Sequence, residues 1–396
     1  MITINHNQKD NKSKLIKKIF GNIYVRRLLF EKVKEINRGL DGQEISTWTM
    51  VKSSLRASVY FGYTDNFRAL LATATQETLT EFIKSRHMYR IASTGKVDIL
   101  HVMHQCCQQQ SSMDEGIVLP CSNILRLAAG HGNFEIVRYI LEVCTHSKNM
   151  FYCRMAMQAA AGNGHMSIVK LIHSHGGISL YNFLKMPLAD MCYYLPSRSM
   201  LHDCGGIDRA AMYGHIDIVK FLTEKQLYRC TTYAMTSAAQ NGDLDLVHYL
   251  HENRTEGCTT DALDGAAGRG HFTMVEFLHS KRSEGCTTKA MDSASSNGHL
   301  DIVQFLHHNR SEGATVDAMD MAAAHGHMEI VRFLAEKRSE GCSEKAILLA
   351  SAGGHLEIVI YLLMNRSENN ILKAMNYAAS NGHKEVFEYL FNHGKK

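Results

Sequence analysis

The chain has 396 residues, of which 45% are hydrophobic and 21% charged, and its formal net charge is +4. This composition excludes an intrinsically disordered chain, because it supplies enough apolar surface for a core. No run of 18 apolar residues occurs, so no membrane span is expected. The start of the chain lacks the apolar stretch of a secretory signal. We therefore expect a cytoplasmic protein, with the nucleus as the alternative location.

Residues 1–90 predict a helical N-terminal segment. Residues 1–60 hold 12 Lys and Arg against 5 Asp and Glu, so the basic character of the chain lies here. Residues 14–38 read as two basic amphipathic helices. The simplest role of such a segment is to cap the end of a neighbouring array. Two alternatives stay open: contact with acidic lipid or nucleic acid, which the modest charge disfavours, and a docking module.

Residues 122–394 repeat one pattern, A-A-x-x-G-H-φ-[DE]-I-V-x-F-L, where φ is apolar. A fixed period is typical of a solenoid, in which each unit buries its apolar face against its neighbours. We count about nine repeats, with an insertion near 179–203 that predicts either a binding loop or a neutral expansion. Residues 91–121 predict a degenerate repeat or a linker. Two pattern glycines, Gly132 and Gly164, are irregularly spaced. The other seven lie 28 residues apart and are Gly214, Gly242, Gly270, Gly298, Gly326, Gly354 and Gly382.

Residues 258–285 show how one repeat is expected to fold. Thr259 is a good N-cap, because its hydroxyl can accept a hydrogen bond from the first turn. A first helix is predicted from Thr260 to Arg269, and Gly270 supplies the left-handed residue that ends it. A second helix follows. The predicted buried residues are Leu263, Ala266 and Ala267 on the first helix and Met274, Val275, Phe277 and Leu278 on the second.

This unit, with A-A-x-x-G-H-x-x-I-V-x-x-L, resembles the ankyrin repeat, and the resemblance covers about residues 122–394. It implies an all-α, ankyrin-type helix-turn-helix solenoid behind the helical N-terminal segment. It also implies a protein partner. The period of 28 is shorter than the family's usual one, and the usual T-P-L-H opening is replaced by T-T-x-A-M-D. The linker N-R-S-E-G-C-T is similar to that of large ankyrin families of lower eukaryotes.

A partner is expected to bind where the repeats differ, on the inner face of the first helices. Five residues before each glycine the side chains grow toward the C-terminus, from serine and glycine to methionine, leucine and tyrosine. These side chains form either an apolar docking patch or packing between adjacent first helices. The predicted partner-binding residues are Asp264, Asp292, Asp320, Met321, Leu348, Leu349 and Tyr377.

Several patterns look chemical without predicting chemistry. Seven histidines follow a pattern glycine, but each lies in a different repeat, so they cannot share one metal ion, and we expect them to cap the turn. His101, His104, Cys106 and Cys107 form a local cluster that we read as part of a degenerate repeat. An Arg/Glu pair in each linker, such as Arg282 and Glu284, predicts an ion-pair chain between repeats, with a phosphate-binding row as the alternative.

The chain is not expected to be an enzyme. It lacks the nucleotide-binding, zinc-protease and hydrolase motifs, and we expect no cofactor and no metal. We interpret it as a monomeric scaffold or adaptor that binds a protein. The alternative is a substrate receptor of a ubiquitin ligase, because Ile19, Phe20 and Trp48 loosely resemble an F-box. The 11 cysteines, odd in number and without tight spacing, are expected to be free thiols.

Overall fold

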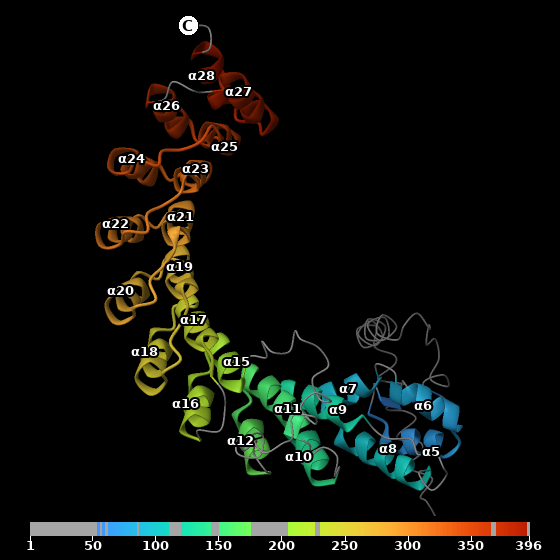
Figure 1. Ribbon diagram of the computed structural model, residues 1–396. Helices are drawn as coiled ribbons and strands as arrows, with labels where there is room; N and C mark the ends of the chain where they lie inside the picture. The colour runs from blue at the N-terminus through green and yellow to red at the C-terminus, as the bar shows by residue number, and fades with distance from the viewer. Residues whose placement is uncertain are drawn as a thin grey trace, which may run out of the picture. The chain divides into compact units, whose positions relative to one another are not determined.

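The computed structural model describes residues 54–55, 58–59, 62–84, 87–110, 120–143, 150–175, 205–225, 230–365 and 370–393. Within these ranges the chain forms helices joined by turns and contains no strand (Figure 1). They group into two compact units, residues 1–128 with 135–144 and residues 129–134 with 145–396. The basic segment 14–38, Trp48 and the insertion at 179–203 lie outside the described residues, and the predictions for them stay predictions.

The first unit contains two turns that resemble those of the repeats. Gly95, with φ of 75°, separates two helices as the predicted degenerate repeat requires. Gly62 has the same φ and lies 33 positions earlier, before another helix. Lys96 reaches back from the later turn and donates a hydrogen bond of 2.8 Å to the carbonyl of Val59. The helices are α5 (Thr64–Ala72), α6 (Gln76–Lys84), α7 (His87–Thr94), α8 (Val97–Gln110), α9 (Cys121–Gly130) and α10 (Phe134–Val143).

The second unit is a series of helix pairs. In each pair a first helix, a glycine turn and a second helix follow one another, and a linker leads to the next pair. The first helices are α11 (Met150–Gly162), α15 (Gly206–Met212), α17 (Thr232–Gln240), α19 (Thr260–Gly268), α21 (Thr288–Ser296), α23 (Val316–Ala324), α25 (Lys345–Gly353) and α27 (Ile371–Ser380). The second helices are α12 (Met166–Ser174), α16 (Ile216–Glu224), α18 (Leu244–Asn253), α20 (Phe272–Lys281), α22 (Leu300–Asn309), α24 (Met328–Lys337), α26 (Leu356–Asn365) and α28 (Lys384–His393).

The predicted repeat is confirmed in its helices and its core. The first helix starts at Thr260 after the N-cap Thr259, and Gly270 has a φ of 79°. All seven residues predicted to be buried are buried. The hydroxyls of Thr287 and Thr315 accept first-turn hydrogen bonds as expected of N-caps. Thr259 makes no such bond. Its hydroxyl lies 3.4 Å from the carboxylate of Asp261 instead.

The helices of the second unit lie in two layers (Figure 1). First helices pack closely on the first helices of neighbouring repeats, whereas second helices touch one another much less. The alanines of the repeat pattern permit this close approach, because their side chains are small and fully buried. The first helices therefore form the inner, concave layer of this unit and the second helices its outer layer.

The histidines that follow the turn glycines connect neighbouring repeats. They are the N-cap residues of the second helices, but where the cap is described they make no side-chain cap bond. The ring of His355 instead lies 3.1 Å from the carbonyl of Ala324, in the preceding turn, and His383 makes the equivalent contact with Ala352 at 2.8 Å. The expected hydrogen bond to a turn is therefore made across the repeat junction, to the turn of the preceding repeat.

Candidate protein-binding surface

The inner layer presents a row of apolar side chains near the C-terminal end of the array. Met321 on α23, Leu349 on α25 and Tyr377 on α27 occupy the same position, five residues before the turn glycine. Met321 and Leu349 are half-buried, and Tyr377 is 45% exposed. At this position the earlier helices α17, α19 and α21 carry Ser237, Gly265 and Ser293. We call Met321, Leu349 and Tyr377 the floor row.

Leu348, also predicted to bind a partner, does not belong to this surface. It is 9% exposed, although its neighbour Leu349 is half-buried. Leu348 lies one residue along the helix, which turns its side chain by about 100°. The predicted patch thus contains both kinds of residue that the sequence left open, namely packing residues and accessible residues. Leu348 packs in the interior of the array, and the floor row stays accessible.

Asp264, Asp292 and Asp320 hold successive repeats together. In each, Oδ1 accepts a hydrogen bond of 2.8 Å from a backbone N–H of the following linker. Oδ2 accepts a second bond from the hydroxyl of the same linker residue. Asp320 is 1% exposed and Asp264 is also buried. These contacts explain the recurrence of the aspartates, so we leave them out of the binding surface. The linker residues are Thr287, Thr315 and Ser343.

Two further residues make the same kind of connection and were missed by the sequence reasoning. Asp208 is fully buried and accepts bonds from both the N–H and the hydroxyl of Thr231. Burial raises the pKa of Asp208, and the bonds from Thr231 and Gly205 oppose that rise. Thr236 accepts a bond of 3.0 Å from the N–H of Thr259. The constant distance of 23 residues between each acceptor and its donor is the signal that could have revealed them.

Other exposed apolar residues on the inner layer were not predicted. Leu372, at the start of α27, is 70% exposed, and Val316 at the start of α23 is also exposed. The helices α17, α19 and α21 carry threonine at this position, so the apolar substitution is visible in the sequence. A separate pair lies toward the other end of the array, where the hydroxyl of Tyr233 is 3.6 Å from the sulfur of Met212.

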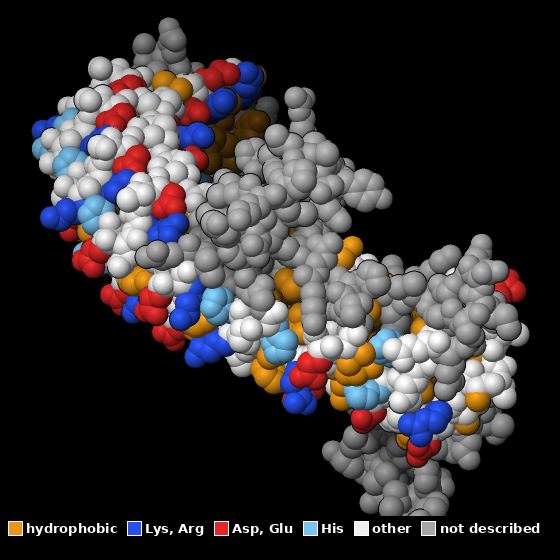
Figure 2. Space-filling view, turned by 60° about the horizontal axis from the view of Figure 1, so that its bottom comes forward, with side chains coloured by type: hydrophobic (Ala, Val, Ile, Leu, Met, Phe, Trp, Pro, Cys, Tyr) orange, Lys and Arg blue, Asp and Glu red, His pale blue; other side chains and the backbone are white. Residues whose placement is uncertain are grey.

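Acidic and basic side chains are mixed on the face drawn in Figure 2. Among the coloured residues they alternate along the repeats, and no large area carries one sign. A nucleic-acid surface would need clustered Lys and Arg, and the coloured residues of this face do not form such a cluster.

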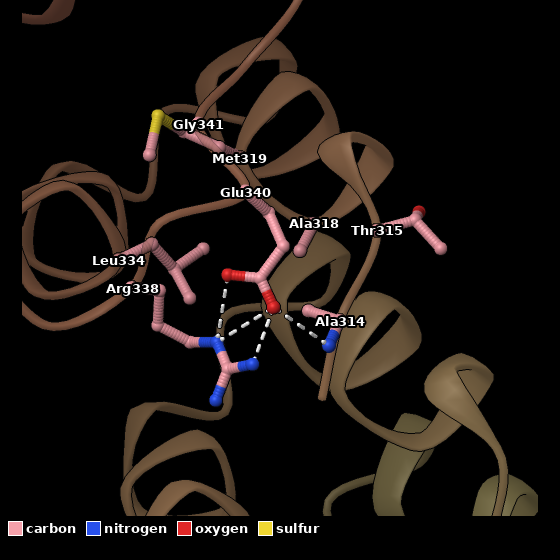
Figure 3. A pocket seen from close by; sticks show the side chains of 8 residues that line it. All are labelled: Ala314, Thr315, Ala318, Met319, Leu334, Arg338, Glu340 and Gly341. Carbon is pink, nitrogen blue, oxygen red and sulfur yellow. Dashed lines mark hydrogen bonds and ion pairs between the residues drawn. The ribbon is translucent and has the colours of Figure 1, made fainter. Parts of the chain in front are cut away.

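The linker Arg/Glu pairs serve as connectors between repeats. Figure 3 shows the fork of Arg338 facing the carboxylate of Glu340, while Oε1 of Glu340 also accepts a hydrogen bond of 3.4 Å from the N–H of Ala314. The ion pair is thus formed within one linker, and the carboxylate-to-amide bond joins that linker to the linker before it. The contact with the preceding repeat is made by Nη1 of Arg338, which lies 3.3 Å from Nδ1 of His307. The predicted ion-pair chain between repeats is corrected accordingly. Each of the four linker arginines in the described residues is paired with a glutamate, which disfavours the phosphate-binding alternative there.

The Arg338–Glu340 pair predicts a loss of stability in acid. The hydrogen bond from Arg338 lowers the pKa of Glu340 to about 2, from an ordinary value of 4.5. A depressed folded-state pKa means that the stabilisation is complete above about pH 4.5 and is lost as pH falls toward 2. We expect this pair to contribute roughly 1–2 kcal/mol after screening by solvent. Urea unfolding at pH 6, 4 and 3 measures this loss. Glu340→Gln should make the dependence shallower, and an unchanged slope would contradict the assignment.

The His/Cys cluster of the first unit has partners within the chain. Nδ1 of His104 lies 2.7 Å from the hydroxyl of Tyr139, and the ring of His101 stacks on Tyr139 at 3.9 Å between centroids. Burial raises the pKa of the Cys107 thiol to about 11, which disfavours the thiolate that a metal needs. In the described part of the chain no group of three His, Cys, Asp or Glu side chains could hold a metal ion.

The cysteines of the described residues are all free thiols. Cys258, Cys286 and Cys342, which follow the linker glycines, are buried, and burial raises the pKa of Cys258 and Cys286 to about 11. They act as small apolar residues. No helix within the described ranges is both long and apolar enough to cross a membrane. The F-box-like residues Ile19, Phe20 and Trp48 are outside the described residues.

Comparison with known families identifies the repeats. A model of ankyrin repeats in three copies matches residues 235–320 and 319–396, and a second model of ankyrin repeats in many copies matches residues 207–251. No curated protein matches the chain. Ankyrin repeats act in general as modules for protein–protein interaction. The matched residues, the paired helices and the glycine turns agree, and residues 207–396 are therefore an array of ankyrin repeats.

Proposed function

We propose that this protein is a scaffold or adaptor that binds a protein partner on the inner face of α23, α25 and α27. The observation that carries the proposal is the floor row. The helices α17, α19 and α21 fold with serine or glycine at this position, so the fold does not require large apolar side chains there. Apolar residues that stay accessible side by side are typical of binding surfaces.

The absence of a large positive area on the face of Figure 2 and the paired linker arginines support a protein partner over a nucleic acid. The free, buried thiols suit a reducing compartment such as the cytoplasm. We propose binding without catalysis, because Met321 and Leu349 offer neither a nucleophile nor a general base and the phenol of Tyr377 alone is not a catalytic set.

The test replaces two members of the floor row in the full chain. The double variant Met321→Ser with Leu349→Ser is expected to lose most of the proteins captured by proximity labelling in cells. The control is Met364→Ser on α26, because Met364 is 73% exposed and lies on the outer layer. The control should retain the same proteins.

A thermal unfolding curve separates binding from packing. We expect the double variant to unfold within a few degrees of the unaltered chain, because both side chains are partly solvated already. A large drop in melting temperature would show that the floor row serves the fold. Retention of all partners by a folded double variant would also contradict the proposal.

A further inference from the structure

The floor row has a regular spacing that restricts the shape of its partner. Its members lie on successive first helices, which pack side by side. Helices in contact are separated by about 8–10 Å. The apolar contacts offered by Met321, Leu349 and Tyr377 are therefore arranged in a line with steps of about 10 Å.

Of the regular backbones, the α-helix matches this step, because it presents residues i and i+7 on one side about 10.5 Å apart. A β-strand covers about the same distance in three residues, but residues i and i+3 point to opposite faces of a strand. A strand that lies on the inner layer would find few free backbone groups, because the first helices bond their own N–H and C=O groups internally. A helix satisfies its own backbone groups, so it can bury an apolar side against the row without that penalty.

The charged edge of the floor row adds a second requirement. One turn before each floor residue stands a charged side chain: Asp317 on α23, Lys345 on α25 and Lys373 on α27. Residues four apart on a helix share one face, so these charges border the row. Lys373 already faces Glu344 at 3.6 Å. Lys345, in the middle of the edge, thus favours an acidic side chain beside the central contact of the partner.

The opposite edge is lined by small side chains. Three residues after each floor residue stand Ala324, Ala352 and Ser380, which leave room on that side. The row is therefore bordered by long charged side chains on one edge and by short ones on the other. A helical partner can therefore lie closer to the edge with the small side chains, while its polar side contacts Lys345 on the other edge.

Resting on the proposed function, we infer that the partner element is an amphipathic α-helix of another protein. Its apolar residues recur at i, i+7 and i+14 over the floor row, and an acidic residue next to the middle one faces Lys345. The contact spans two repeat steps, or about 20 Å, which corresponds to roughly 14 residues of helix. A partner helix of this length is partly ordered at best when alone, and it becomes fully helical on binding.

The test uses the full chain and fluorescent designed helical peptides of about 20 residues. The matched peptide carries leucine at i, i+7 and i+14 with glutamate beside the middle leucine. A respaced peptide of identical composition carries leucine at i, i+5 and i+10. Fluorescence anisotropy should show at least tenfold tighter binding of the matched peptide, and Leu349→Ser should weaken that binding at least tenfold. Met364→Ser should leave it unchanged.

The charge requirement has its own variant, which leaves the apolar row intact. Lys345→Glu alters an exposed side chain and is expected to fold normally. It should bind the matched peptide at least fivefold more weakly and should recover when lysine replaces the glutamate beside the middle leucine. The inference would be overturned if the matched and respaced peptides bound equally well. It would also be overturned if Lys345→Glu bound the glutamate and lysine peptides equally well. If cellular partners still depend on Met321 and Leu349 in that case, the proposed function stands and only the helical partner is excluded.

Discussion

Replacing Gly270 by alanine is expected to lower the free energy of unfolding by about 2–5 kcal/mol. Two costs add at this residue. Its φ of 79° costs an alanine about 1–2 kcal/mol, and its new Cβ would lie 2.5 Å from Cε1 of His299 in the next repeat. Overpacking of this kind costs about 1–3 kcal/mol. Chemical unfolding followed by circular dichroism measures the sum.

Gly382 provides the matched control, because it has a φ of 78° and no described atom lies within 4 Å of the position of a Cβ. Gly382→Ala should therefore cost only the conformational part, about 1–2 kcal/mol. Adding His299→Ala to Gly270→Ala should recover part of the loss by removing the clash. Equal losses at Gly270 and Gly382 would show that the ring moves aside freely, and that the histidines do not hold the turns together.

Asp320→Ala is expected to destabilise the array by about 2–4 kcal/mol. The change leaves the N–H and the hydroxyl of Ser343 without the carboxylate that accepts from both. Hydrogen bonds to a charged group contribute about 1.5–3 kcal/mol, and an abandoned buried donor costs a further amount. Equilibrium unfolding in urea measures the loss. Asp320→Asn retains one acceptor, so its free energy of unfolding should lie between those of the unaltered chain and of Asp320→Ala.

Asn376 occupies the same position in the last repeat and is exposed, so it is the control for Asp320. Asn376→Ala should change stability by less than about 0.5 kcal/mol. A similar small effect at Asp320 and Asn376 would mean that the aspartates do not hold the repeats together. The prediction that they contact a partner would then be supported again.

Local signals made most of the fold predictable. The period of the glycines, the threonine N-caps and the apolar stripes each depend on residues within one repeat, and helix α19 begins and ends within one residue of its predicted bounds. The roles of side chains between repeats were harder to predict. Whether Asp320 faces solvent or the next linker depends on the path of that linker, which periodicity alone does not specify.

The candidate surface was predicted in part for the same reason. Leu348 and Leu349 are adjacent and chemically identical, and only the rotation of α25 against its neighbours places one inside and the other on the surface. The histidines repeat faithfully, but the sequence does not reveal that their rings point backward. Repetition indicates that a residue matters to the scaffold without indicating which neighbour it contacts.

The repeats that contain α19, α21 and α23 carry both halves of a junction. The aspartate of such a repeat accepts hydrogen bonds from the repeat that follows, whereas the histidine after a turn glycine reaches the repeat that precedes it and the linker glutamate reaches the preceding linker. Deleting or duplicating one unit of 28 residues would therefore recreate the same junction chemistry at the new boundary. Gene-level recombination can then lengthen or shorten the array without any compensating substitution. The reach of the inner face, and with it the size of the partner that can be held, is a property that evolution can adjust in whole steps.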